Sequence, residues 1–400
     1  MASHAYRRAT GFTIVELMVA LTVGAIALSS LYAVGSASTR HFREQQRISN
    51  TQSSLRAAMN QVKHDFARAG YLATPSINVP AERCAQIGPP INSTANVLGN
   101  GQLAAVSALF KDVTRPAELD PANLNAWARV DDVILMGNYA TSGEYSGVVI
   151  DGTRFVVTIP TTTQSFTRDF THWFAENGRP VGACSPTALA AAFPPNRLVR
   201  LHTQAETHLF AQVVGTTCND PAPTASITLA TSVPVSCNVT AGWISPVNTI
   251  RYRVVAATGT EASRVGPNDV AVLRRTEVNP ANRAAALTVN AAGNVVNADD
   301  RVVLDYVVRF DVNFLLRNTA TTNQAQLVPA TQAEIAANPE RIRTAIIELA
   351  ARTPVHEPLM DVRLGTMRLP PFRVTNTVGS ARTRALRAEL FLPNIAYKGY

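Results

Sequence analysis

The pattern of apolar and polar residues changes twice along the chain. Residues 12–34 are mostly apolar, and Glu16 is the single charged residue among them. From residue 40 to residue 69, apolar residues recur at intervals of three, four, six and seven positions. These residues are Phe42, Ile48, Leu55, Met59, Val62, Phe66 and Ala69. Such spacing is typical of one face of an amphipathic helix. Beyond Gly70 the period shortens to that of strands separated by Gly, Pro, Asn and Thr.

The first two segments together predict one long helix. At about 1.5 Å of rise per residue, residues 12–34 span roughly 34 Å, which is enough to cross the apolar core of a bilayer. Residues 35–70 form the amphipathic half of the helix, and Gly70 is a natural stop. The leader, residues 1–11, carries Arg7 and Arg8 and no acid. It should therefore remain cytoplasmic and leave the rest of the chain outside.

Residues 71–400 predict a β-rich globular domain. Its expected strands are 132–137, 155–159, 198–202, 209–214, 226–230, 249–256, 270–275, 302–316, 342–352 and 384–392. The run 342–352 could also be helical, and we interpret it as a strand. Residues 72–128, 160–197 and 317–340 show no regular period and predict long surface loops. The fold class is therefore α+β, with a long N-terminal helical spine packed on a mainly antiparallel domain with long loops.

The composition supports a folded domain. The chain has 400 residues, of which 46% are hydrophobic and 16% charged, and this balance excludes a disordered chain. The net charge is +8. The basic residues are spread along the chain and never form a run, so a nucleic-acid partner is not expected.

Four cysteines, which are Cys84, Cys184, Cys218 and Cys237, predict disulfides behind an export segment, because none lies in a C-x-x-C pair. A bond between Cys218 and Cys237 would close a short loop and stabilise the fold by roughly 3 kcal/mol in the chain-entropy model. That pairing would leave Cys84 and Cys184 as a second bridge. Four cysteines allow about three pairings, and all of them stay open at this point.

The sequence contains no recognised catalytic motif. G-x-S-x-G, H-E-x-x-H and the phosphate-binding Walker loop do not occur. We therefore expect no catalytic residue, no metal, no cofactor and no small-molecule substrate.

Glu16 needs an explanation, because a charge inside the apolar core of a bilayer costs at least ~2.5 kcal/mol. The surrounding stretch, GFTIVELMVAL at residues 11–21, closely resembles the N-terminal signature of type IV prepilins and secretion pseudopilins. The resemblance implies that a prepilin peptidase cuts between Gly11 and Phe12 and that Phe12 is then N-methylated. It also implies that Glu16, fifth in the mature chain, approaches the amino terminus of a neighbouring subunit during assembly. An ordinary signal peptide, cut after Gly35 or Ala37, would explain export but not Glu16.

The rest of the chain is similar to minor pilins of the PilW type. The similar segments are DFARAGY at 65–71, IRYRVVA at 250–256, VAVLRRTEV at 270–278 and ARTRALRAELFLPN at 381–394. The resemblance implies a non-enzymatic minor pilin that primes filament assembly at the tip with other minor pilins and the major pilin. It would reside in the inner membrane with a periplasmic domain before it enters the pilus, whose uses include adhesion and twitching motility. The alternatives are a pseudopilin of a type II secretion system and a tip subunit for adhesion or DNA uptake.

Overall fold

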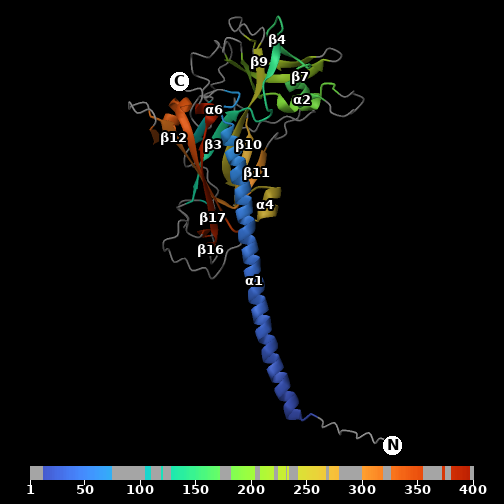
Figure 1. Ribbon diagram of the computed structural model, residues 1–400, viewed down its shortest axis with the longest axis vertical. Coiled ribbons are helices and arrows are strands. Elements are labelled where there is room, and N and C mark those ends of the chain that lie inside the picture. The colour runs from blue at the N-terminus through green and yellow to red at the C-terminus, as the bar shows by residue number, and fades with distance from the viewer. Residues whose placement is uncertain are drawn as a thin grey trace, which may run out of the picture. The chain divides into compact units, whose positions relative to one another are not determined.

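The computed structural model describes the chain in segments (Figure 1). The described residues are 12–73, 104–109, 119, 128–171, 182–202, 208–219, 224–230, 232–233, 242–266, 270–278, 300–318, 326–354, 372–373 and 380–396. Gly11, Cys84 and Cys237 lie outside these ranges. The chain divides into two compact units, residues 1–53 and residues 54–400.

The first unit consists of the N-terminal part of helix α1 (Ile14–Ala67). Thr13 caps the helix, since its Oγ1 accepts a hydrogen bond from the backbone N–H of Glu16 at 3.2 Å. The hydroxyl groups of Thr22, Ser29 and Ser30 donate to carbonyl groups of the preceding turn, so these polar side chains are satisfied within the helix.

The second unit begins with the end of α1, whose buried residues are Leu55, Ala58, Met59, Val62, Asp65 and Phe66. The predicted apolar face is therefore confirmed from Leu55 onwards. It is wrong for Phe42, which is 67% exposed. The helix ends at Ala67, and Gly70 adopts a left-handed conformation with φ of 78°. A glycine reaches this conformation without the steric penalty that a side chain would bring.

Two mainly antiparallel sheets share one hydrophobic core with this helical segment. The first runs through β1 (Val106–Leu109), β3 (Asp132–Gly137), β9 (Gly242–Ala256), β10 (Ala271–Glu277) and β11 (Asp300–Asp305). The second runs through β13 (Leu327–Pro329), β12 (Val307–Arg317), β14 (Ile342–Arg352) and β17 (Thr383–Phe391), and β2 (Arg129–Val130) pairs with β12 in parallel. Phe66 of the helix stacks on Phe314 of β12.

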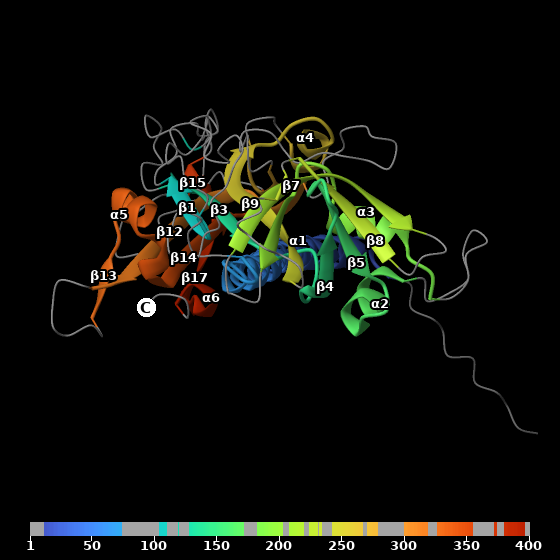
Figure 2. The same ribbon diagram turned by 90° about the horizontal axis from the view of Figure 1, so that it is seen from above.

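A closed barrel is inserted between β3 and the second half of β9. Its strands are β4 (Tyr145–Ile150), β5 (Val156–Pro160), β8 (Thr224–Leu229), β7 (His208–Asn219) and β6 (Leu198–His202). Residues 242–244 of β9 pair with β4 and residues 243–247 pair with β6, so this part of β9 closes the ring. The barrel has its own hydrophobic core, which includes helices α2 (Gln164–Phe170) and α3 (Pro186–Ala192). Figure 2 shows β4, β5, β7 and β8 grouped together.

The remaining described elements are short. They are α4 (Thr260–Val265), α5 (Gln332–Ala337), the 3₁₀ turn η4 (Pro339–Arg341), α6 (Pro393–Ala396), and the paired strands β15 (Phe372–Arg373) and β16 (Ser380–Ala381). Helix α5 begins with a capping box, in which Thr331 and Glu334 satisfy each other's backbone N–H groups.

The predicted mainly antiparallel α+β fold is confirmed, and every predicted strand overlaps an observed one. The ambiguous run 342–352 is strand β14. The single strand predicted at 302–316 is wrong, because Tyr306 has a φ of 54° and divides the run into β11 and β12, which belong to different sheets. The prediction that the three aperiodic stretches are loops without regular structure is wrong in part. They contain β1 in the first, α2 and α3 in the second, and β13, α5 and η4 in the third.

The suggested bond between Cys218 and Cys237 is also wrong. Cys218 of β7 is bonded to Cys184, which stands just before Ser185, the N-cap of α3, and their Cα–Cα distance is 5.9 Å. After Cys218 the chain turns into β8, which runs antiparallel to β7 and carries the following residues away from that cysteine. Closeness in sequence therefore does not give closeness in space. The observed bond holds the start of α3 against the barrel wall.

We expect replacement of both Cys184 and Cys218 by alanine to lower the free energy of unfolding by roughly 3–4 kcal/mol, because the bond closes a loop of 34 residues. Denaturant unfolding of the detergent-solubilised chain, followed by tryptophan fluorescence, measures the loss. Peptide mapping under non-reducing conditions is the control, and it should recover the Cys184 peptide linked to the Cys218 peptide. Recovery of Cys218 linked to Cys237 would contradict the pairing.

Candidate functional site

The first candidate site is the start of α1, where the sequence places Phe12 and Glu16. Phe12 is 84% exposed, and Glu16 lies in the first turn of the helix. A carboxylate at this position interacts favourably with the N-terminal end of the helix dipole. Among the described residues, no basic side chain pairs with Glu16, so the partner that its charge requires in an apolar environment is not supplied by the described part of this chain.

Large apolar side chains surround Glu16 on every side of the helix. Those that are exposed are Ile14, Val15, Leu17, Met18, Val19, Leu21, Val23, Ile26, Leu28, Leu31, Tyr32 and Val34. By length and composition, α1 could cross a membrane. An uninterrupted apolar exterior of this kind is suited to lipid or to the apolar surfaces of neighbouring helices, not to water.

The second candidate site lies in the second unit, where the end of α1 meets the first sheet. Asp65 is only 1% exposed. Its Oδ2 accepts hydrogen bonds from Arg275 Nε at 2.5 Å and from the hydroxyl of Tyr252 at 2.6 Å, while Gln61 Nε2 donates to Oδ1 at 3.1 Å. Tyr252 and Arg275 are directly opposite each other on β9 and β10. The carboxylate therefore ties the helix to two strands at once.

Burial changes the acid–base properties of this cluster. Burial raises the pKa of Tyr252 well above its usual value, and the charge of Asp65 raises it further. Burial alone would lower the pKa of Arg275, but the negative charge of Asp65 outweighs that effect and leaves the pKa above its usual value. Arg275 therefore keeps its positive charge beside a neutral phenol.

Backbone groups at the end of α1 are satisfied by distant parts of the chain. Asn394 Nδ2 donates to the carbonyl of Ala67 at 2.7 Å, and the N–H of Gly70 donates to the carbonyl of Met136 at 2.8 Å. The helix end also lies so close to β3 that a Cβ on Gly137 would come within 2.5 Å of the carbonyl oxygen of Arg68. Only glycine fits at that position without a shift of the backbone.

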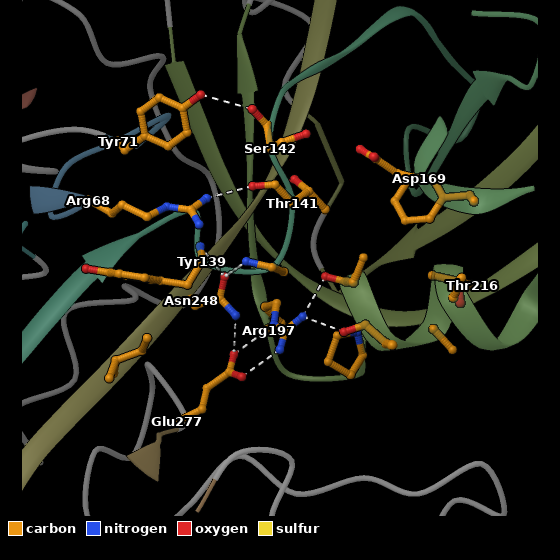
Figure 3. Close-up of a pocket in the computed structure, with 18 of the residues that line it drawn as sticks. Arg68, Tyr71, Tyr139, Thr141, Ser142, Asp169, Arg197, Thr216, Asn248 and Glu277 are labelled. Atoms are coloured by element: carbon orange, nitrogen blue, oxygen red, sulfur yellow. Dashed lines mark hydrogen bonds and ion pairs between the residues drawn. The ribbon is translucent and has the colours of Figure 1, made fainter. Parts of the chain in front are cut away.

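Next to this junction lies a groove of about 1460 Å³ (Figure 3). Its lining comes from the end of α1, the loop after β3, helices α2 and α3, and strands β7, β9 and β10. Two ion pairs lie along it. Arg197 donates to both oxygens of Glu277 at 2.7 and 2.6 Å, and Arg168 donates to Asp169 at 2.8 and 3.1 Å.

The acids of the groove are already fully engaged. Asn248 Nδ2 donates to Glu277 at 2.9 Å, and the hydroxyl of Tyr145 donates to Asp169 at 2.8 Å. Burial acts to raise the pKa of Asp169, but the hydrogen bonds from Arg168 and Tyr145 outweigh it, and the pKa lies below its usual value. Because these carboxylates are held in ion pairs and hydrogen bonds, the arrangement favours binding over proton transfer. Among the described residues, no group of three or more His, Cys, Asp or Glu side chains could hold a metal ion.

The N-terminal residues were singled out from the sequence, but the cluster around Asp65 was missed. The four segments quoted above for their resemblance to minor pilins converge here: they contain Asp65, Tyr252, Arg275 and Asn394. A usable signal was present, because Asp65 stands next to Phe66 on the face that otherwise carries apolar residues. A charged residue on a buried face requires a partner.

We expect Asp65→Asn to lower the free energy of unfolding by about 3–5 kcal/mol, because it leaves the charge of Arg275 buried without its counter-ion. The matched control is Asp305→Asn, which removes the same charge from the exposed pair with Arg264 and should cost less than about 1 kcal/mol. Denaturant unfolding of the detergent-solubilised chain compares the two. Similar losses in both variants would show that the cluster does not hold the helix to the sheet.

Comparisons with known proteins identify the N-terminal segment. A family model described as the prokaryotic N-terminal methylation motif matches residues 6–32. No curated protein matches the chain. Among solved structures, a type IV-like pilin from Thermus thermophilus aligns at 14% identity over 52% of this chain and 94% of its own, with a TM-score of 0.18. The matched motif therefore places an N-terminal methylation signature around Gly11, Phe12 and Glu16.

Proposed function

We propose that this chain is a minor pilin of the PilW type, a non-enzymatic structural subunit that primes assembly of a type IV pilus. The observation that carries the proposal is Glu16. It is an acid in an exposed apolar helix, inside the matched methylation motif, with no basic partner among the described residues.

The maturation steps follow from the same motif. A prepilin peptidase cuts between Gly11 and Phe12 and methylates the new amino terminus of Phe12. The matched segment includes both residues, and the large exposure of Phe12 is consistent with access by an enzyme. The helix begins at Ile14, so the proposed cut falls before its first turn.

Assembly then depends on the charge of Glu16. In lipid, neither Glu16 nor the amino terminus of a neighbouring subunit is paired. At a separation of ~4 Å and an intermediate dielectric, the two attract by about 4 kcal/mol. This attraction favours one axial register between adjacent helices. The partners are other minor pilins and the major pilin.

The position at the filament tip is supported by the second unit. The inserted barrel adds a second hydrophobic core to the one that the helix shares with its two sheets. Subunits of a shaft repeat at short axial intervals and leave little room for such an insertion. The subunit resides in the inner membrane with its domain in the periplasm before assembly. The bond between Cys184 and Cys218 is consistent with that oxidising compartment.

A pseudopilin of a type II secretion system is the second candidate, because it would carry the same leader and the same acid. Neighbouring genes distinguish the two: minor pilin genes favour the pilus, and secretion-channel genes favour the pseudopilin.

The test replaces Glu16 by glutamine in a strain that lacks the chromosomal copy. We expect the variant to be cut before Phe12 and methylated, as N-terminal mass spectrometry would show. We also expect at least tenfold less of it in sheared filaments, because loss of even ~1.4 kcal/mol of docking energy gives that factor. The matched control is Glu44→Gln, which neutralises an acid on the same helix beyond the apolar run and should assemble normally. If sheared filaments contained as much of the Glu16 variant as of the wild-type subunit, the proposal would be contradicted.

A further inference from the structure

The arginines of the groove differ in how their charges are balanced. Three of them face a carboxylate within the domain, in the pairs Arg168–Asp169, Arg197–Glu277 and Arg275–Asp65. Arg68 differs, because among the described residues its guanidinium meets no carboxylate. Its hydrogen bond there runs from Nη2 to the backbone carbonyl of Thr141 at 2.7 Å. The groove therefore carries one arginine charge that the described residues do not compensate.

The guanidinium of Arg68 is held in place by two aromatic rings. It lies 5.5 Å from the ring centroid of Tyr71 and 5.8 Å from that of Tyr139 (Figure 3). Both rings are fixed in turn, since Tyr71 donates its hydroxyl to the carbonyl of Ser142 and Tyr139 donates to the carbonyl of Asp65. A stacked guanidinium is pre-organised for bidentate bonding to a carboxylate. Nη2 keeps a second N–H group, and with the adjacent Nε or Nη1 it can form one bidentate edge for such a ligand, because none of these groups makes a further hydrogen bond to the described residues.

The size of the groove indicates what carries the carboxylate. Pockets for small molecules typically enclose roughly 300–1,000 Å³, and this groove is larger, at about 1460 Å³. Its lining beyond Arg68 mixes apolar residues such as Ala188 and Pro195 with hydroxyls such as that of Thr216. This mixture suits an extended peptide. A single uncompensated positive charge matches one carboxylate better than the accumulated charge of a phosphate or a nucleic acid.

We propose that the groove is the docking site for an acidic, extended segment of another polypeptide, and that Arg68 binds its carboxylate. The rest of the groove accommodates the backbone and the neighbouring side chains of that segment. This interaction is separate from the pairing of Glu16, because it involves only residues of the second unit.

The test uses two fluorescein-labelled nonapeptides of alternating glycine and serine, one with a central glutamate and the other with a central glutamine. Fluorescence anisotropy measures their binding to the full chain purified in detergent. We expect the glutamate peptide to bind at least tenfold more tightly, as a charge-assisted hydrogen bond allows. Arg68→Gln should reduce its affinity to that of the glutamine peptide.

Two further variants control for unfolding. Arg264→Gln removes an exposed arginine charge outside the groove and should keep the preference for glutamate. Thr216→Trp fills the groove without altering the residues that hold Arg68, so it should abolish binding of the glutamate peptide even if Arg68→Gln fails to fold. Equal binding of the two peptides by the wild-type chain would overturn the proposal. So would a preference for glutamate that survives either Arg68→Gln or Thr216→Trp. Because no filament is involved, none of these outcomes depends on the role of Glu16.

Discussion

The carboxylate of Asp65 is the interaction on which the second unit depends. It is buried at the end of α1, and it is held by side chains from two adjacent strands and by one from its own helix. A buried charge of this kind is costly unless every lone pair finds a donor in the right place. The cluster therefore fixes the rotation and the height of the helix relative to β9 and β10, which packing of apolar side chains alone would define less sharply. The groove beside it inherits its geometry from this junction.

Asp65 and Glu16 lie on the same helix, and for both the transfer of a carboxylate out of water costs free energy unless a partner compensates for it. Asp65 is satisfied within the chain, so its charge contributes to folding. Glu16 lies in an apolar segment and has no partner among the described residues. In the proposed function, its charge contributes only when another subunit arrives. A single helix thus separates folding, at its C-terminal end, from assembly, at its N-terminal end.

The sequence was informative where local patterns decide the structure and uninformative where pairing between distant segments decides it. The predicted bounds of β14 were correct although its residues also allowed a helix, and the apolar run predicted the N-terminal helix. The closed barrel could not be read from the sequence, because its ring is completed by pairings of β9 with strands far away in the chain. The disulfide depended on the same long-range geometry. Tyr306 divides the run 302–316 by adopting a left-handed backbone conformation. A tyrosine in the sequence does not predict this conformation. The cluster around Asp65 was hidden because its members come from three separate segments.

Strand β9 belongs to the barrel and to the first sheet at the same time. Residues 242–247 complete the barrel, and the following residues carry Tyr252 to the buried carboxylate at the helix end. Tension applied to the barrel would consequently travel along one covalent strand into the anchor of the helix, without crossing a flexible hinge. The barrel is therefore mechanically coupled to the helix and its sheets, so a force on the barrel would be transmitted to the end of the helix.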